Sequence, residues 1–151
     1  MKPIPESPSL LLEEFLPYRL SVLSNQISGA IARLYAERFD LTIAEWRVMA
    51  VLGRFGPQTA VEITGRTAMD KVRVSRAVAR LTSMGRLARA DDPADRRRKP
   101  MRLTEAGLTV HEAIVPMALA VEARLISRLA EPDRAALDRA IQALSVAIQA
   151  E

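Results

Sequence analysis

Apolar residues recur at three- and four-residue steps along most of this chain, which is the spacing of one face of an α-helix. The first run starts at Pro17, which suits the first turn of a helix because an N–H there would have no helical partner. It continues through aliphatic residues at Leu20, Leu23, Ile27, Ile31 and Leu34. Similar runs follow Thr104, as far as about residue 128, and Pro132. The pattern predicts long amphipathic helices at both ends of the chain.

Between these ends, two short segments begin with the same signal. Thr42 and Glu45, and then Thr59 and Glu62, have the spacing of a capping box, in which a hydroxyl and a carboxylate each bind a free amide of the first turn. We expect helices from these points, ended by glycines at 53, 56 and 65. A fourth helix with Val72, Val74, Val78 and Leu81 on its apolar side follows and should stop at Gly85.

After Gly85 the period changes to two. Leu87 and Arg89 precede a polar turn, and Met101 and Leu103 then alternate with polar positions, as expected of a two-stranded hairpin. Its tip holds Arg96 to Lys99. Pro100 cannot donate a hydrogen bond to a sheet, so we expect its strand to lie at an edge. Helix, short helix, turn, basic helix and hairpin together predict a winged helix-turn-helix.

Charge supports a DNA-binding interpretation. Residues 70–104 contain eleven Lys or Arg and four Asp, a net charge of about +7, whereas the whole chain is only +4. Such a cationic surface binds duplex DNA by releasing condensed counterions. The polar positions at the start of the basic helix, expected to face the major groove, are Lys71, Arg73, Ser75 and Arg76. A cationic hairpin tip suits the narrow minor groove.

Composition excludes several other classes. A hydrophobic content of 49% over 151 residues predicts one folded domain with a real core. The absence of cysteine and the single histidine argue against disulfides, a thiol switch or a transition-metal site, so we expect neither metal nor cofactor. No apolar run approaches membrane length, and the start lacks a signal-peptide core, so we expect no membrane partner.

At this point the sequence resembles the MarR family of bacterial transcriptional regulators over nearly its whole length. The resemblance is carried by Leu41-Thr42 with Glu45-Trp46, by Val74-Ser75-Arg76 with Leu81 and Gly85, and above all by the wing segment from Asp92 to Gly107. It implies a mainly α fold with a small β-hairpin wing, forming a homodimer through the N- and C-terminal helices. Within the single domain 1–151, residues 42–103 would bind DNA, and residues 10–38 and 104–150 would dimerise.

The resemblance also implies roles for individual side chains in the wing and in a sensing cleft. Arg97 would enter the minor groove with Asp95 orienting it, beside Arg96 and Arg98. Because residues 15–20 resemble a subgroup that controls hydroxycinnamate-type catabolism, the effector would be an aromatic acid or its CoA thioester. The candidate contacts are Tyr18, Arg19, Trp46, Arg47 and His111. Three of them have a plainer alternative: Trp46 as core, Arg19 as an intersubunit salt bridge, and His111 as an ordinary helix histidine.

We therefore expect a ligand-responsive repressor that binds a pseudo-palindromic operator as a homodimer in the bacterial cytoplasm, associated with the nucleoid. An architectural protein that binds DNA without sequence preference is the alternative, and comparing operator with scrambled DNA separates the two. An enzyme is not expected, because the chain has no phosphate-cradling glycine loop, cysteine nucleophile or paired-carboxylate motif. The effector and the operator sequence are not determined by these residues.

Overall fold

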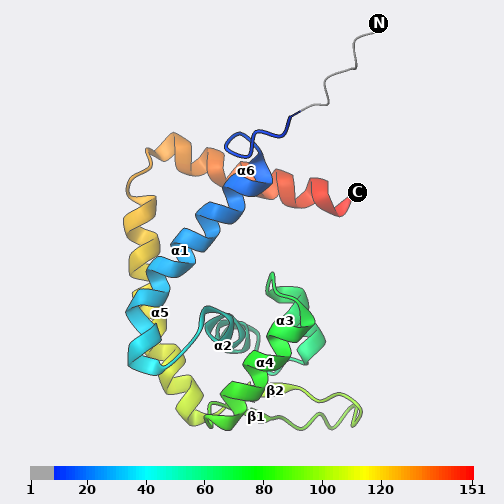
Figure 1. Cartoon of the computed structure of the whole chain (residues 1–151). Helices are drawn as coiled ribbons and strands as arrows, with labels where there is room; N and C mark the ends of the chain where they lie inside the picture. Colours follow the sequence, from blue (N-terminus) through cyan, green and yellow to red (C-terminus); the bar gives the residue numbers. More distant parts are fainter. Residues whose placement is uncertain (1–8) are drawn as a thin grey trace, which may run out of the picture.

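The computed structural model describes residues 9–151. Six helices and one hairpin follow in the expected order (Figure 1). Their bounds are α1 Leu16–Phe39, α2 Ile43–Phe55, α3 Ala60–Arg66, α4 Lys71–Ser83, β1 Leu87–Arg89, β2 Met101–Leu103, α5 Glu105–Ile126 and α6 Glu131–Gln149.

The predicted helix starts are confirmed, but two of the predicted stops are wrong. Thr42 and Thr59 both form complete capping boxes, Thr104 caps α5, and Pro17 lies in the first turn of α1. Gly53, however, lies inside α2, which continues to Phe55, and Gly65 lies inside α3. The real stops are Gly56 and Gly85, because both adopt a positive φ of 72° that ends a helix without steric cost.

The hairpin has the predicted strands but a different neighbour. β1 and β2 pair antiparallel with Leu87 opposite Leu103 and Arg89 opposite Met101. On its other side, Met101 exchanges two backbone hydrogen bonds with Gln58, at 2.8 and 3.0 Å. β2 is an edge strand of this two-stranded sheet, as expected, but Met101 also forms an isolated bridge with Gln58. Pro100 itself is fully buried, and its missing N–H is not needed because only its carbonyl, which accepts from Ala90, takes part in pairing.

A single core lies where α2, α3 and α4 meet the root of the wing, the C-terminal end of α1 and the N-terminal half of α5. Its most enclosed members are Tyr35, Val48, Met49, Ile63, Val74, Leu81 and Ile114. Val72 is not one of them, since 58% of it is exposed, although the predicted apolar side of α4 included it. The core thus holds the winged helix as one compact lobe.

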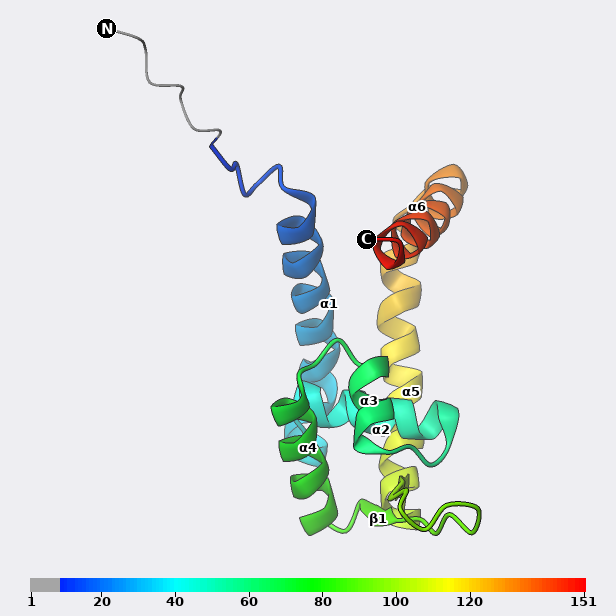
Figure 2. The same ribbon diagram turned by 90° about the vertical axis from the view of Figure 1, so that its right-hand side faces the viewer.

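Outside this lobe, long apolar helix faces have no partner within the described chain. α1 and α5 extend away from the lobe, and α6 crosses at their far end (Figure 1, Figure 2). α6 buries none of its residues, and its Leu137, Ile141, Leu144 and Ile148 are between 43% and 72% exposed. An apolar groove of about 710 Å³ lies between these helices, lined by residues that include Leu23, Ile27, Leu119 and Leu125.

α5 corrects one further expectation. By length and composition alone it could cross a membrane, with a mean hydropathy of 1.3 over an 18-residue window, of which 17% is buried. The prediction that no segment reaches this length is therefore wrong. Core helices of soluble proteins pass the same test, and here the N-terminal half of α5 contributes Ile114 to the core.

Candidate nucleic-acid interface

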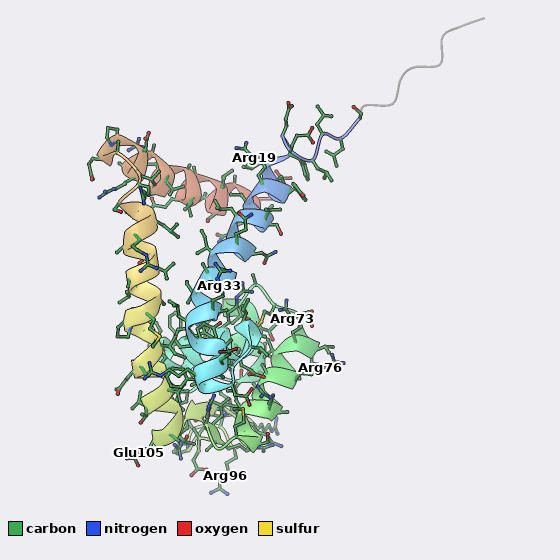
Figure 3. The ribbon with its side chains drawn as sticks, turned by 60° about the vertical axis from the view of Figure 1, so that its left-hand side comes forward. Arg19, Arg33, Arg73, Arg76, Arg96 and Glu105 are labelled. Carbon is green, nitrogen blue, oxygen red and sulfur yellow. The ribbon has the colours of Figure 1, made fainter. Side chains whose placement is uncertain are left out.

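The basic helix α4 is held by its apolar side and presents its cations outward. The Asp70 side chain caps it by accepting the backbone N–H of Arg73 at 2.8 Å, and Val74, Ala77 and Leu81 anchor it in the core. The predicted contact residues Lys71, Arg73, Ser75 and Arg76 are all exposed. Figure 3 shows Arg73 and Arg76 projecting from α4 on the same side of the molecule. The structure thus leaves the first two turns of α4 accessible to a groove of DNA.

The wing loop is shaped by aspartates that bind backbone amides. Asp92 Oδ1 accepts from the N–H groups of Ala94 (3.1 Å) and Asp95 (3.2 Å), and Asp95 Oδ1 accepts from the N–H of Arg97 (2.9 Å). Asp95 therefore orders the backbone at Arg97 and leaves the guanidinium of Arg97 exposed. Arg96 is also exposed and points away from the body of the molecule (Figure 3).

Arg98 differs from its two neighbours. Its guanidinium binds Glu62 of α3, with Nη2–Oε2 at 2.6 Å, and Asp92 of the wing, with Nη1–Oδ2 at 3.2 Å. The hydrogen bond from Arg98 is the main cause that lowers the pKa values of Glu62 and Asp92 below their ordinary range. The predicted DNA contact at Arg98 is thus directed back towards α3, where it ties the wing to the helix-turn-helix.

Sequence spacing did not identify this tie, because its partners lie 36 residues apart. It also did not identify Arg80 of α4, which reaches Glu45 of α2, 35 residues away. The only local signal was that Glu45 and Glu62 are the acidic members of the two capping boxes. A capping carboxylate has a second oxygen or lone pair free to bind a cation.

The predicted sensing residues fall into two separate places. The Trp46 ring lies between Tyr35 and His111, with ring centroids 5.9 and 5.6 Å apart, and the neighbouring Arg47 donates to Ser28 Oγ at 3.3 Å. Tyr18 and Arg19 line a separate groove near the start of α1. Arg19 lies sixteen residues before Tyr35 on the same helix, which corresponds to about 24 Å. Figure 3 shows Arg19 far from the lobe.

His111 lies in a close-fitting seat. A Cβ atom added to Gly53 would lie 2.2 Å from its Nε2, so only glycine leaves room for the ring. Its Nδ1 is buried and has no hydrogen-bond partner among the described residues, and burial lowers the pKa of the imidazole below 6.5. At neutral pH the ring is therefore uncharged and carries one unused polar nitrogen beside Trp46.

Comparison with known proteins places this arrangement in a family. The profile of the MarR family matches residues 39–98. An uncharacterized HTH-type transcriptional regulator of Bacillus cereus is 30% identical over 104 residues, which cover 69% of this chain and 68% of that protein. The chain belongs to the MarR family. It is a DNA-binding transcriptional regulator with a winged helix-turn-helix.

Two further similar proteins, one a curated relative and one a solved structure, have a described activity. The transcriptional repressor NicR of Pseudomonas putida is 28% identical over 98 residues, which cover 65% of this chain and 62% of NicR, less than two thirds of its length. The structure of Bordetella bronchiseptica BpsR, described as regulated in its DNA binding by 6-hydroxynicotinic acid, superposes with a TM-score of 0.76 at 25% identity. The superposition covers 92% of this chain and 98% of BpsR.

The wing motif of this MarR-family protein can now be explained physically. Asp95 accepts the Arg97 amide, and Thr104 caps α5 and donates from its hydroxyl to the Gly85 carbonyl at 2.6 Å. Gly107 is needed because a Cβ there would lie 2.1 Å from the Arg86 carbonyl oxygen. The motif therefore fixes both the loop of the wing and its attachment to α5.

Proposed function

We propose that this MarR-family protein is a homodimeric repressor whose binding to a pseudo-palindromic operator is released by an aromatic acid or its CoA thioester. The observation that carries the DNA part is that the cations at the start of α4 and those at the tip of the wing, on one winged helix, are exposed. Residues 42–103 form the DNA-binding lobe in this proposal, and residues 10–38 and 104–150 form the dimer. Such a repressor acts in the bacterial cytoplasm, where its operator lies.

The exposed apolar faces support the dimer. Leu20 and Leu23 of α1 are 49% and 53% exposed, and Ile141 of α6 is 54% exposed. Contiguous apolar surface of this kind is costly in water and marks an interface. A second copy, related by a two-fold axis, would cover the groove between α1, α5 and α6 with the same surface. The two α4 helices would then enter major grooves about one helical turn apart.

Within each half-site, the proposed contacts divide by groove. Lys71, Arg73, Ser75 and Arg76 of α4 would contact base edges and phosphates in the major groove. Arg97 would enter the minor groove, with Arg96 on the adjacent backbone. Arg98 would act through the wing by holding it against α3.

The separation of the sensing residues constrains the effector site. A single aromatic acid cannot span about 24 Å, so Tyr18 and Arg19 would reach a ligand held at Trp46 and His111 only from the partner chain. Arg19 suits a carboxylate, which it can bind bidentately, and Trp46 can stack on a ring. The similarity to NicR, which is named a repressor, supports repression. The similarity to BpsR, which is described as regulated by 6-hydroxynicotinic acid, supports a hydroxylated aromatic acid as the effector.

An operator-binding experiment tests the proposal. A duplex selected by the protein from random DNA should contain a palindrome and be bound at least about 10³-fold more tightly than a scrambled duplex at the same salt concentration. Light scattering should show a dimer. A ratio near one would favour the architectural alternative, and a monomer at micromolar concentration would refute the dimer.

The effector part has its own test. Addition of 6-hydroxynicotinic acid, and of hydroxycinnamic acids and their CoA thioesters, to the operator complex should release the DNA for at least one compound. Arg19→Ala should weaken this release while leaving operator binding and dimer formation intact. Loss of the dimer in this variant would show instead that Arg19 is structural.

A further inference from the structure

We propose that Arg80 is a positioning residue that fixes the orientation of α4 for operator recognition, acting through Glu45 and Asp40 without contacting DNA. The proposal rests on the operator binding proposed above. Arg80 Nη1 lies 2.6 Å from Glu45 Oε2 and 3.1 Å from the backbone carbonyl of Asp40. Its Nη2 lies 2.9 Å from Asp40 Oδ2. One side chain therefore joins α4 to the start of α2 and to the end of α1.

The position of Arg80 along α4 suggests a different role at first. Arg73, Arg76 and Arg80 are separated by three and four residues, so they follow one stripe of the helix. They share a groove of about 320 Å³ with Thr42 and Ala44. A phosphate contact would be the simple interpretation of such a stripe. Arg73 and Arg76, however, are exposed, whereas the guanidinium of Arg80 donates to the carboxylates of Glu45 and Asp40.

Glu45, the main partner of Arg80, is buried and held in place by the capping box of α2. Its side chain is 5% exposed, and the oxygen that Arg80 binds also accepts the N–H of Thr42 at 3.0 Å in the capping box of α2. A buried carboxylate needs such partners because it has lost its water. The hydrogen bond to Glu45 is the main cause that raises the pKa of Arg80, followed by that to Asp40, so the guanidinium stays charged.

Asp40 links the same guanidinium to α1. It is the C-cap residue of α1 and, within residues 9–151, the only residue other than glycine with a positive φ, at 50°. Asp tolerates this left-handed conformation better than most side chains. Because Arg80 binds both the carbonyl and the carboxylate of this residue, the end of α1 and the recognition helix cannot shift independently without breaking a hydrogen bond.

Two variants of opposite charge test this role. Arg80→Gln removes a positive charge, and Asp40→Gly removes a negative one while suiting the left-handed backbone. A positioning role predicts that both lower the ratio of operator to scrambled-DNA affinity, by about tenfold and about threefold respectively, the smaller effect being on the scale of an exposed ion pair. Both should leave the slope of log affinity against log salt concentration unchanged, because no phosphate contact is lost.

The matched control is Arg76→Gln, one turn earlier on the same stripe. A phosphate contact there predicts a slope smaller by about one and weaker binding to both duplexes. If Arg80→Gln behaves like Arg76→Gln, or if Asp40→Gly tightens binding as the loss of a negative charge near DNA would, the positioning role is refuted. Arg80→Lys should recover part of the ratio, since it keeps the charge but not the forked geometry.

Failure of this proposal is distinguishable from failure of the proposed function. If the unaltered protein selects no palindrome, the function is wrong. If it does and the variants leave the affinity ratio unchanged, only the role of Arg80 is wrong. Melting temperatures identify variants that fail to fold, and Asp40→Gly keeps the test valid if Arg80→Gln unfolds, because the Asp40 side chain is 80% exposed.

Discussion

The attachment of the wing to α5 gives a prediction whose magnitude follows from the structure. Gly107 is buried in the first turn of α5, and a methyl group in its place would lie 2.1 Å from the carbonyl oxygen of Arg86. That oxygen accepts the N–H of Thr104 at 3.0 Å, and the Thr104 hydroxyl donates to Gly85. The atoms that would have to move are therefore backbone atoms already held by two hydrogen bonds.

The cost of Gly107→Ala can be summed from these contacts. Forcing an extra carbon into a filled site costs up to about 3 kcal/mol, and losing the hydrogen bond from Thr104 to Arg86 adds about 1 kcal/mol. The better helix propensity of alanine offsets about 1 kcal/mol of this destabilisation. We expect the free energy of unfolding to fall by about 3 kcal/mol, which lowers the melting temperature of a chain of this size by about 9 °C.

Thermal unfolding followed by circular dichroism, at one protein concentration for all variants, measures this effect. Gly65→Ala is the matched control, because Gly65 is also helical but has no atom within 4 Å of an added Cβ. It should be neutral or stabilising by up to about 1 kcal/mol. A melting temperature for Gly107→Ala within about 2 °C of the unaltered protein would refute the steric argument.

Three further predictions concern the wing and the sensing seat. Arg97→Ala should weaken operator affinity by roughly 1–3 kcal/mol and leave the dimer intact; unchanged affinity in a gel-shift titration would contradict the placement of Arg97 in the minor groove. Because Arg98 lowers the pKa of Glu62, the stability contributed by this pair is present above pH 4.5 and lost as the pH falls through the lowered pKa. Urea midpoints of the unaltered protein and Glu62→Gln should therefore differ at pH 7 and converge in acid, and parallel curves would show that the pair contributes nothing. Burial lowers the pKa of His111, so the free energy of unfolding should be highest above pH 6.5 and should fall as the pH drops from 6.5 to the lowered pKa. His111→Phe should lose this pH dependence. If the variant keeps it, another group is responsible for the titration.

Local sequence signals determined the elements of this protein. A capping box is complete within four residues, and a change from helical to two-residue period is visible within one segment. The helix starts at Thr42, Thr59 and Thr104 and the two strands of the hairpin therefore followed from the chain alone. The exposed cations of α4 were predictable for the same reason, because Val74 and Leu81 define the opposite, buried side.

Tertiary structure decided which of these groups are free to act. Arg96, Arg97 and Arg98 are consecutive in the sequence, and all three were expected to contact DNA, but of these three Arg98 alone binds a carboxylate of α3, 36 residues earlier. Arg80 continues the basic stripe of α4, yet the fold brings it to Asp40, 40 residues earlier. The isolated bridge between Met101 and Gln58, 43 residues apart, was likewise not visible in the local pattern. Charge and periodicity describe a residue and its near neighbours, whereas an ion pair or a strand partner depends on which distant segment the packed core brings beside it.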